Sequence, residues 1–194
     1  MAKVKAPLFG FSASGKLANS LVYMKWKGIN DVRQYVIPAN PKTAGQVTQR
    51  GYMTSAVTLW HTTPLIAADL TAWNVFATTL AQTMSGFNSF VRKVIDALKD
   101  SKTFQALSNA DFASVTATAG TVVMDIAAEG TTTLHWGTSK TVMPESALGV
   151  FDVDHVTFTL AGNTEKTTYY CYAQNAEGTD IGRTGIYKFT TPAA

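Results

Sequence analysis

The chain has 194 residues, of which 46% are apolar and 15% are charged, and its formal net charge is +3 at pH 7. This composition is typical of a globular protein with one large or two small domains. The chain contains no run of eighteen apolar residues, so no transmembrane helix is predicted. The N-terminal segment lacks the apolar region of a secretory signal, so we expect no such signal. A single cysteine, Cys171, excludes an intramolecular disulfide and a multi-cysteine zinc site.

The charges divide unevenly along the chain. Residues 1–109 carry twelve Lys or Arg and four acids, a net charge of +8, whereas residues 110–194 carry four basic residues and nine acids, a net charge of −5. Such asymmetry favours two domains with different neighbours. We expect the basic half to be drawn to an acidic surface.

The N-terminal region predicts an arm followed by a β-hairpin. Residues 1–20 are rich in Gly and Ser and indicate an arm that becomes ordered against a partner. Residues 21–27 and 32–37 are β-rich runs, and the Gly, Asn and Asp residues within 28–31 predict the turn between them. Trp26 shares a face with Val22 and Met24, which places it in a core. Because neither face is purely polar, we expect both to be at least partly covered.

Three amphipathic helices are predicted after the Pro-Asn-Pro hinge at residues 38–41. The first carries an apolar stripe from Val47 to Trp60 and ends before Pro64, and the second begins with Asp69 or Thr71 near its cap. Ser85 opens the third helix, which carries the clearest apolar stripe in the chain. With the hairpin, these helices predict an α+β domain over residues 21–105.

The residue composition changes after residue 108 from helical patterns to β-rich runs. Short β-rich runs occupy residues 121–127, 131–137, 156–160, 167–174 and 185–190, and turn signals at 129–130, 162–163 and 177–178 separate them. This spacing is typical of a β-sandwich, so we predict an all-β domain over residues 110–194. Trp136 follows alternating Thr132 and Leu134 and should point into that sandwich.

Residues 118–192 resemble a shortened fibronectin type III or immunoglobulin-like domain of the kind appended to bacterial and phage surface proteins. TTTLHW at 131–136 is similar to the second strand with its buried tryptophan. TTYYCYAQNAEGTDIG at 167–182 is similar to the penultimate strand and its turn, and GIYKFTTP at 185–192 to the closing strand. The resemblance implies an immunoglobulin-like sandwich.

The N-terminal half resembles small uncharacterised proteins found among the structural genes of tailed bacteriophages and prophages. The shared features are a WKG-containing hairpin, R-x-Y-V-x-P-A-N-P-K-T-x-x-Q-x-x-x-R at 33–50, Trp60, L-T-A-W at 70–73 and S-G-F-N-x-F at 85–90. This resemblance implies a virion component, assembled in the cytoplasm of the bacterial host. No catalytic motif accompanies it.

No residue set predicts an active site, a cofactor site or a metal site, so we expect no enzyme. The three histidines, His61, His135 and His155, lack metal-ligand spacing, and no phosphate-binding glycine loop occurs. Cys171 lies in a predicted buried strand and is interpreted as a packed thiol. Asp152 and Asp154 should share one strand face as a solvated acidic edge, with a weak calcium site as the alternative.

A set of basic and aromatic residues predicts a surface for assembly. The candidate interface consists of Lys25, Trp26, Lys27, Arg33, Tyr35, Lys42, Arg50 and Tyr52. Aromatic anchors would supply desolvated area and the cations would supply orientation. The expected partners are the major capsid protein or other virion subunits, with the chain present as a homo-oligomer or as lattice-bound copies.

Several functions fit this surface. The leading hypothesis is a capsid decoration or head-associated protein, and a neck or tail protein is the alternative within the same class. A nucleic-acid-binding phage protein is the alternative of another class, because cations interleaved with aromatics can contact phosphates and stack on bases. Glycan binding by the sandwich would require exposed rings at residues 169–172 or at Trp136.

Overall fold

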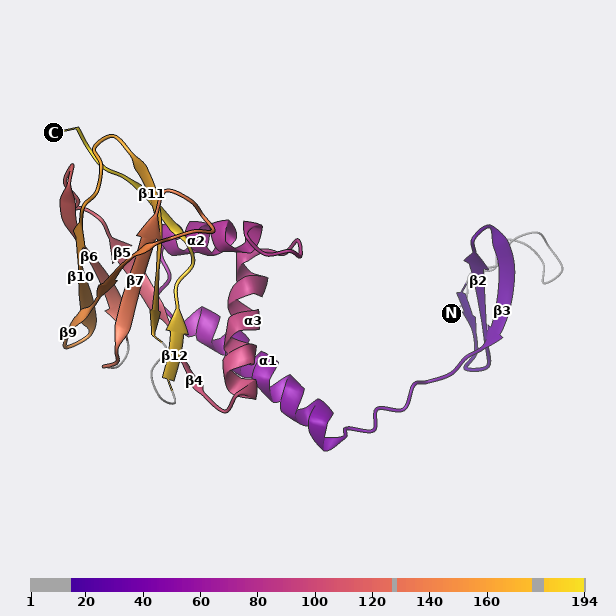
Figure 1. Ribbon diagram of the computed structural model, residues 1–194. Helices are drawn as coiled ribbons and strands as arrows, with labels where there is room; N and C mark the ends of the chain where they lie inside the picture. The colour runs from indigo at the N-terminus through magenta and orange to yellow at the C-terminus, as the bar shows by residue number, and fades with distance from the viewer. Residues whose placement is uncertain (1–14, 127–128, 176–179, 194) are drawn as a thin grey trace. The chain divides into compact units, whose positions relative to one another are not determined.

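The computed structural model describes residues 15–126, 129–175 and 180–193, and these residues form an α+β fold (Figure 1). Their contacts divide the chain into two compact units, Met1–Thr43 and Ala44–Ala194. Most of the predicted arm and the predicted turn at 177–178 lie outside the described residues. No helix among the described residues is long and apolar enough to cross a membrane.

The first unit contains a three-stranded antiparallel sheet. Its strands are β1 (Gly15–Leu17), β2 (Leu21–Trp26) and β3 (Ile29–Gln34), in the order β1-β2-β3. Lys27 and Gly28 join β2 to β3 with φ angles of 48° and 88°. Two successive positive φ angles define the type I′ turn that matches the twist of paired strands.

The hairpin prediction is confirmed, but its turn was placed wrongly. Residues 28–31 were expected to form the turn, whereas Ile29 already pairs with Trp26 across the strands. Gly28 tolerates the left-handed conformation at no steric cost, so the chain reverses within two residues and β3 begins three residues earlier than expected.

Neither face of the first unit's sheet carries a fully buried residue. None of residues 15–43 is buried, and Trp26 and Ile29 are 61% and 72% exposed. The expectation that Trp26 would lie in a core is therefore wrong. Leu21 and Tyr23 on one face, and Val22 and Met24 on the other, are partly buried, as expected of two faces that are at least partly covered. A sheet this small contributes too few side chains to enclose an apolar layer of its own.

The second unit contains the three predicted helices, α1 (Ala44–Thr62), α2 (Ala67–Thr78) and α3 (Gly86–Lys99). Helix α1 ends two residues before Pro64, as predicted. Asp69 caps α2 by accepting the backbone N–H of Ile66 at 2.9 Å. The Ser85 hydroxyl caps α3 by accepting the N–H of Asn88 at 3.3 Å.

The strands of the second unit form two sheets. One has the order β5-β6-β10-β9, and the other has the order β4-β12-β11-β7-β8, with β13 also paired to β11. All pairings are antiparallel except that of β4 with β12. The bounds are β4 Thr103–Gln105, β5 Leu107–Asp111, β6 Ala119–Ile126, β7 Thr132–Gly137, β8 Glu145–Leu148, β9 Val150–Asp152, β10 His155–Ala161, β11 Thr168–Asn175, β12 Asp180–Arg183 and β13 Tyr187–Thr190.

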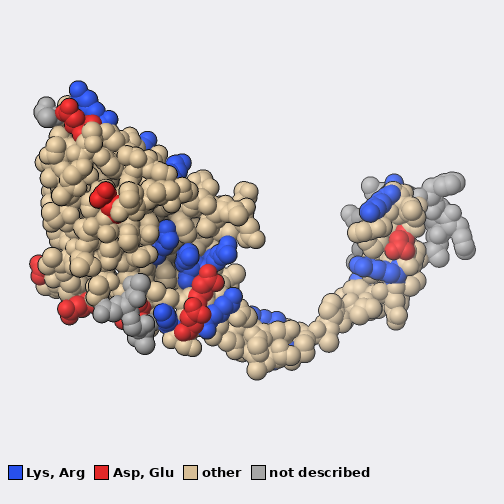
Figure 2. All heavy atoms as spheres, viewed as in Figure 1, with Lys and Arg blue, Asp and Glu red and all other residues tan. Residues whose placement is uncertain are grey.

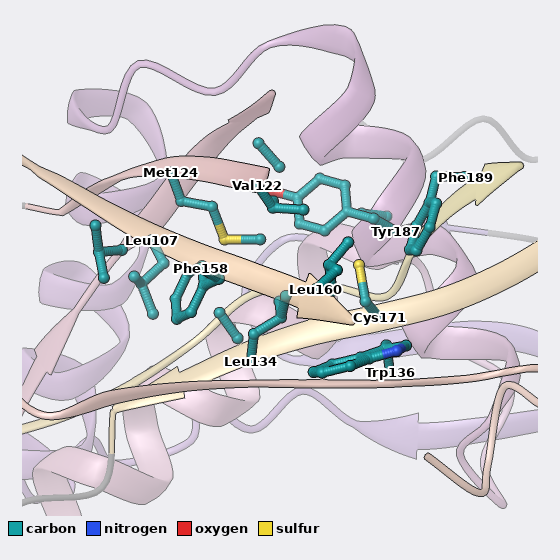
Figure 3. Close-up of a cluster of buried hydrophobic side chains, with 14 of the residues drawn as sticks. Leu107, Val122, Met124, Leu134, Trp136, Phe158, Leu160, Cys171, Tyr187 and Phe189 are labelled. Carbon is teal, nitrogen blue, oxygen red and sulfur yellow. The ribbon is translucent and has the colours of Figure 1, made fainter. Parts of the chain in front are cut away.

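Side chains from both of these sheets meet in one buried cluster (Figure 3). Met124 and Phe158 come from the first sheet, and Leu134, Trp136 and Cys171 come from the second. Buried and partly exposed residues alternate along β7 and β11, which is the pattern of strands with one face against a core. The prediction that Trp136 points into the core is confirmed, because it is only 4% exposed.

The helices share a second buried cluster with strand and loop residues. Trp73 of α2 and Phe90 of α3 pack edge to face with ring centroids 5.1 Å apart, and Phe104 and Ile186 complete the contact from the strand region. The expected division into domains at 21–105 and 110–194 therefore differs from the observed one. Residues 44–105 belong to the same unit as the strands, because their apolar faces are buried against them.

Candidate docking surface

Pairing between the strands of the first unit fixes which side chains share a face. Val22 lies opposite Arg33, and Trp26 lies opposite Ile29, so these four share one side of the sheet. The pairing of Val22 with Lys16 extends this side across β1. We call it the Trp26 face, and it comprises Lys16, Val22, Met24, Trp26, Ile29, Asp31, Arg33 and Tyr35.

Tyr35 joins this face through a cation–π contact. The Lys16 Nζ atom lies 3.8 Å from the centroid of the Tyr35 ring. The backbone N–H of Tyr35 donates to the Ser20 carbonyl at 2.7 Å, which holds the segment after β3 against the β1–β2 turn. Lys16, Arg33 and Tyr35 are among the residues that line a hollow of about 630 Å³.

The opposite side, which we call the Tyr23 face, is also mixed in chemistry. It comprises Leu17, Leu21, Tyr23, Lys25, Asn30, Val32 and Gln34. Leu17 and Val32 are 42% and 51% exposed. Both sides of the sheet therefore present apolar side chains to solvent. The sequence indicated only that neither face is purely polar, not that these side chains are exposed.

The structure does not bring the eight predicted interface residues onto one surface. Trp26, Arg33 and Tyr35 lie on the Trp26 face, whereas Lys25 lies on the Tyr23 face and Lys27 lies in the turn. Lys42 lies in the segment without regular structure that precedes α1. Arg50 and Tyr52 lie on α1, in the other compact unit. The eight predicted residues are therefore divided between the two faces of the sheet, its turn, the segment before α1, and α1 itself.

Most of the basic excess lies in the first structural unit. Residues 1–43 carry seven Lys or Arg and one acid, Asp31, a net charge of +6. Residues 44–194 carry nine basic residues and twelve acids, a net charge of −3. Basic side chains are visible on the described part of the first unit in Figure 2. The cationic character is therefore concentrated in the short N-terminal unit.

Helix α1 carries a further exposed apolar stretch that the sequence did not predict as exposed. Val47 and Met53 belong to its apolar stripe, yet they are 53% and 52% exposed. Ala56, further along the same stripe, is fully buried. Only the C-terminal half of this helix therefore packs into the core of the second unit.

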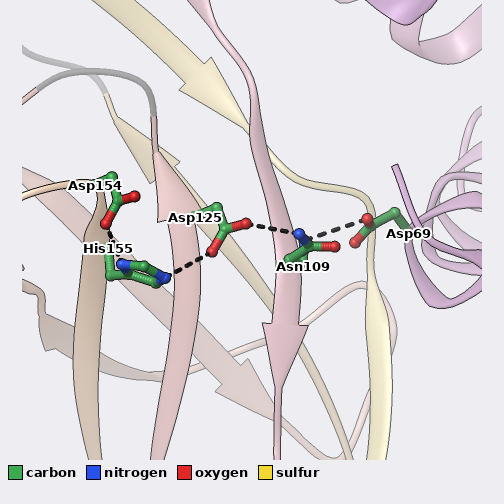
Figure 4. A network of polar contacts seen from close by, with 5 residues as sticks. All are labelled: Asp69, Asn109, Asp125, Asp154 and His155. Carbon is green, nitrogen blue, oxygen red and sulfur yellow. Dashed lines mark hydrogen bonds and ion pairs between the residues drawn. The ribbon is translucent and has the colours of Figure 1, made fainter. Parts of the chain in front are cut away.

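A polar network lies apart from the candidate docking surface. The Asn109 amide donates to Asp125 at 2.6 Å, and Asp125 contacts the His155 Nε2 atom at 3.2 Å (Figure 4). The His155 Nδ1 atom contacts Asp154, and the Asn109 backbone N–H donates to Asp69 at 3.2 Å. No group of three or more His, Cys, Asp or Glu side chains that could hold a metal ion occurs among the described residues. The network connects α2, β5, β6 and the β9–β10 turn.

Other residues singled out from the sequence have structural positions. Cys171 is fully buried, and burial raises the pKa of its thiol, so the prediction of a packed cysteine is confirmed. Asp152 ends β9 and Asp154 lies in the following turn, so the expectation that they share a strand face is wrong. Trp136 and Tyr169 are only 4% and 7% exposed, which removes both rings as glycan platforms.

Comparison with known proteins identifies no family. No protein-family model and no curated protein matches this chain. Among the solved structures, the chain titled "Myokine structure" aligns with 45% of this chain and with 97% of its own length, at 16% sequence identity and a TM-score of 0.38. A similarity at that level carries no argument about fold or function.

Proposed function

We propose that this chain is a non-enzymatic structural protein of a tailed-bacteriophage particle, most consistent with capsid decoration or another head-associated role. In this proposal, the N-terminal unit docks onto virion subunits and the second unit projects from the particle. The observation that carries the proposal is the sheet at residues 15–34, in which no side chain is buried on either face.

A three-stranded sheet in water needs a covered apolar face to be stable on its own. Trp26 and Ile29 are 61% and 72% exposed and lie directly opposite each other. Large apolar side chains that adjoin each other on a surface are typical of an interface with another protein. Burial against a partner subunit would therefore stabilise the sheet and bind the chain in the same step.

The chemistry of the unit suggests what the partner surface contains. Five basic residues lie within residues 15–43, against one acid, Asp31. An apolar patch with an acidic rim would complement both the Trp26–Ile29 pair and the surrounding cations. The resemblance of residues 33–90 to phage structural proteins makes a virion subunit, such as the major capsid protein, the proposed source of that surface.

We propose further that the strands of the second unit are an immunoglobulin-like or fibronectin-type sandwich. Two sheets contribute to one core cluster, and the buried Trp136 lies in that cluster. Many cell-surface domains share this sandwich architecture. Many copies bound to a symmetric lattice would hold even if each individual contact were weak.

A nucleic-acid-binding phage protein is the second candidate, and one observation favours it. Trp26 is exposed and shares a face with Arg33, so an aromatic ring and a cation are available together. The cations of the sheet are nevertheless divided, because Lys25 points to the Tyr23 face. A groove that binds the backbone of a nucleic acid would require these cations to lie along one path. Protein docking is therefore the better supported function.

Co-sedimentation of the purified chain with particles that lack it tests the docking function. The double substitution Trp26→Ala/Ile29→Ala should weaken binding by about tenfold or more, because truncated apolar anchors at interfaces cost 1–2 kcal/mol or more. Val142→Ala/Val153→Ala is the matched control, since these apolar residues are 64% and 84% exposed in the second unit. Control binding should be unchanged.

The opposite pattern would contradict the proposal. If the Trp26→Ala/Ile29→Ala protein sediments like the wild type, the sheet is not the docking element. If the chain ignores particles but binds single-stranded DNA with an affinity that falls steeply with salt, the second candidate replaces the first.

A further inference from the structure

The second unit contains a desolvated arginine between its helical and strand layers. Arg183 ends β12, and its guanidinium carbon lies 4.4 Å from the Phe76 ring centroid and 4.1 Å from that of Tyr172. Phe76 belongs to α2 and Tyr172 to β11. Contact with two aromatic rings removes water from the faces of the guanidinium. Burial accordingly lowers the pKa of Arg183.

This cation has no anionic partner in the described part of the chain. The Arg183 Nε atom is buried and makes no hydrogen bond there. The ion pairs at His155 do not involve Arg183, and no carboxylate of the described residues lies within ion-pair distance of its guanidinium. A desolvated guanidinium retains its charge, and its fork of N–H donors is suited to a carboxylate or a phosphoryl group.

The guanidinium lines a pocket large enough for a small ligand. The pocket measures about 530 Å³, and Lys140, Thr141, Met143, Tyr172 and Ile186 line it together with Arg183. No acidic residue lines this pocket. Asp96 and Asp100 line a separate hollow on Arg183 of about 200 Å³, together with Lys93, and neither forms an ion pair with Arg183. The larger pocket therefore presents two cations and no acid.

We propose that this pocket binds a small oxyanion, a phosphoryl or carboxylate group, with Arg183 as the principal donor and Lys140 as the second cation. Thr141, which also lines the pocket, supplies a further polar side chain. The site lies wholly within residues 44–194, so it is independent of the docking function proposed for the N-terminal sheet.

The environment of Tyr172 argues against a neutral sugar as the ligand. The His135 ring stacks on Tyr172 with centroids 5.1 Å apart, and Arg183 contacts the same ring at 4.1 Å. A sugar platform needs a free aromatic face, whereas this ring already has two neighbours. Tyr172 therefore orients the cation, and the cation recognises the ligand.

Nuclear magnetic resonance of the ¹⁵N-labelled full chain tests the site, with the Arg183 Nε–H signal as the reporter. Titration with inorganic phosphate, and in a second arm with succinate, should shift this signal saturably in at least one arm. Sodium chloride at matched ionic strength should not reproduce that shift. The phosphate and succinate arms distinguish a phosphoryl from a carboxylate preference.

Three variants separate binding from folding. Arg183→Met lacks the Nε–H reporter and is followed through the backbone N–H signals of Thr141 and Tyr172, which line the same pocket. Arg183→Met should abolish saturable binding, and Lys140→Met should weaken it about tenfold, because hydrogen bonds to charged groups are the strong ones. Arg92→Met is the matched control, since Arg92 is exposed on α3 and lines no part of the pocket. If Arg183→Met fails to fold, the titration of Lys140→Met still tests whether the pocket binds the oxyanion. A linear shift that chloride reproduces, or equal affinities for the Lys140→Met and Arg92→Met proteins, would overturn the proposal.

Discussion

Asp69 is the residue at which the helices and strands of the second unit meet. Its carboxylate is 1% exposed and accepts the Tyr187 hydroxyl at 2.5 Å, the Ile66 N–H at 2.9 Å and the Asn109 N–H at 3.2 Å. Three donors offset the cost of burying a charge. The sequence placed either Asp69 or Thr71 near the cap of α2, but the contacts of Asp69 with β5 and β13 depend on residues distant in the chain and carry no local signal.

Substitution Tyr187→Phe should lower the free energy of unfolding by about 2 kcal/mol, because it leaves the buried carboxylate of Asp69 without its shortest hydrogen bond. Burial and the neighbouring Asp69 carboxylate both raise the pKa of Tyr187, so its hydroxyl stays protonated and able to donate. Urea denaturation measures the change.

The matched control is Tyr170→Phe, because the Tyr170 hydroxyl makes no hydrogen bond with described residues and its ring contact with Lys140 survives the substitution. Its unfolding free energy should stay within about 0.5 kcal/mol of the wild type. Equal losses in the two variants would contradict the role assigned to Asp69.

His135 should make stability depend on pH. Burial, and then the Arg183 charge, lower the pKa of His135 in the folded chain. The unfolded chain therefore binds the proton more tightly, so the free energy of unfolding is highest above about pH 6.5 and falls as the pH drops below it.

Denaturation at several pH values between 5 and 8 measures this dependence in the wild type and in His135→Gln. The variant should show a flatter profile over this range. His61→Gln is the control, since His61 is exposed on α1, and it should keep the wild-type profile. An unchanged slope in His135→Gln would show that another group titrates.

At the scale of elements, the periodicity of apolar residues predicted most of the secondary structure. The three helices and the strands around Val122, Leu134 and Phe158 lie where the pattern places them. The error at Trp26 has a physical cause, because alternation shows which side chains share a face but not whether anything covers that face. Exposure depends on what packs against the sheet.

Helix α2 also contacts the strand region through backbone. The Ile186 N–H donates to the Ala72 carbonyl at 2.9 Å. A Cβ atom at Gly185 would lie 2.3 Å from the Ala72 carbonyl carbon and 2.4 Å from the Trp73 nitrogen. Backbone atoms cannot yield as a flexible side chain can, so only glycine fits there.

Gly185→Ala should therefore destabilise the second unit by several kcal/mol, on the order of 3 or more, because it separates α2 from the strands. Gly51→Ala is the control with the opposite sign. Nothing lies within 4 Å of a Cβ at Gly51, which is inside α1, so alanine should stabilise that helix by about 1 kcal/mol. Thermal denaturation of both variants measures the contrast, and a tolerated Gly185→Ala would contradict the packing.

At the scale of the whole molecule, composition misplaced the boundary between units. Residue composition changes from helix-forming to strand-forming near residue 108, which suggested separate domains. Buried side chains from α2 and α3 nevertheless pack in one cluster with Phe104 and Ile186, so the helices and strands share a core. Local residue composition indicates secondary structure, whereas the boundary between two domains depends on which apolar faces pack together. The charge division at residue 109 gave the same boundary, although residues 1–43 carry +6 of the net charge of +8 in that half.

A fragment of residues 44–194 should unfold cooperatively, with a melting temperature within about 3 °C of the full chain, because it retains both buried clusters. A fragment of residues 106–194 should not fold stably, because it lacks Trp73 and Phe90 from the helical cluster. Calorimetry distinguishes them. A stable 106–194 fragment would contradict this expectation and support the domain boundary predicted near residue 108 from residue composition.

Electron cryomicroscopy of particles that carry the chain tests the central claim most directly, because it shows which residues touch a neighbouring subunit. We predict density for residues 15–43 against that subunit, with Trp26 and Ile29 at the contact and the second unit extending outward. Particles in which residues 44–194 make the contact, while the Trp26 and Tyr23 faces stay in solvent, would contradict the account.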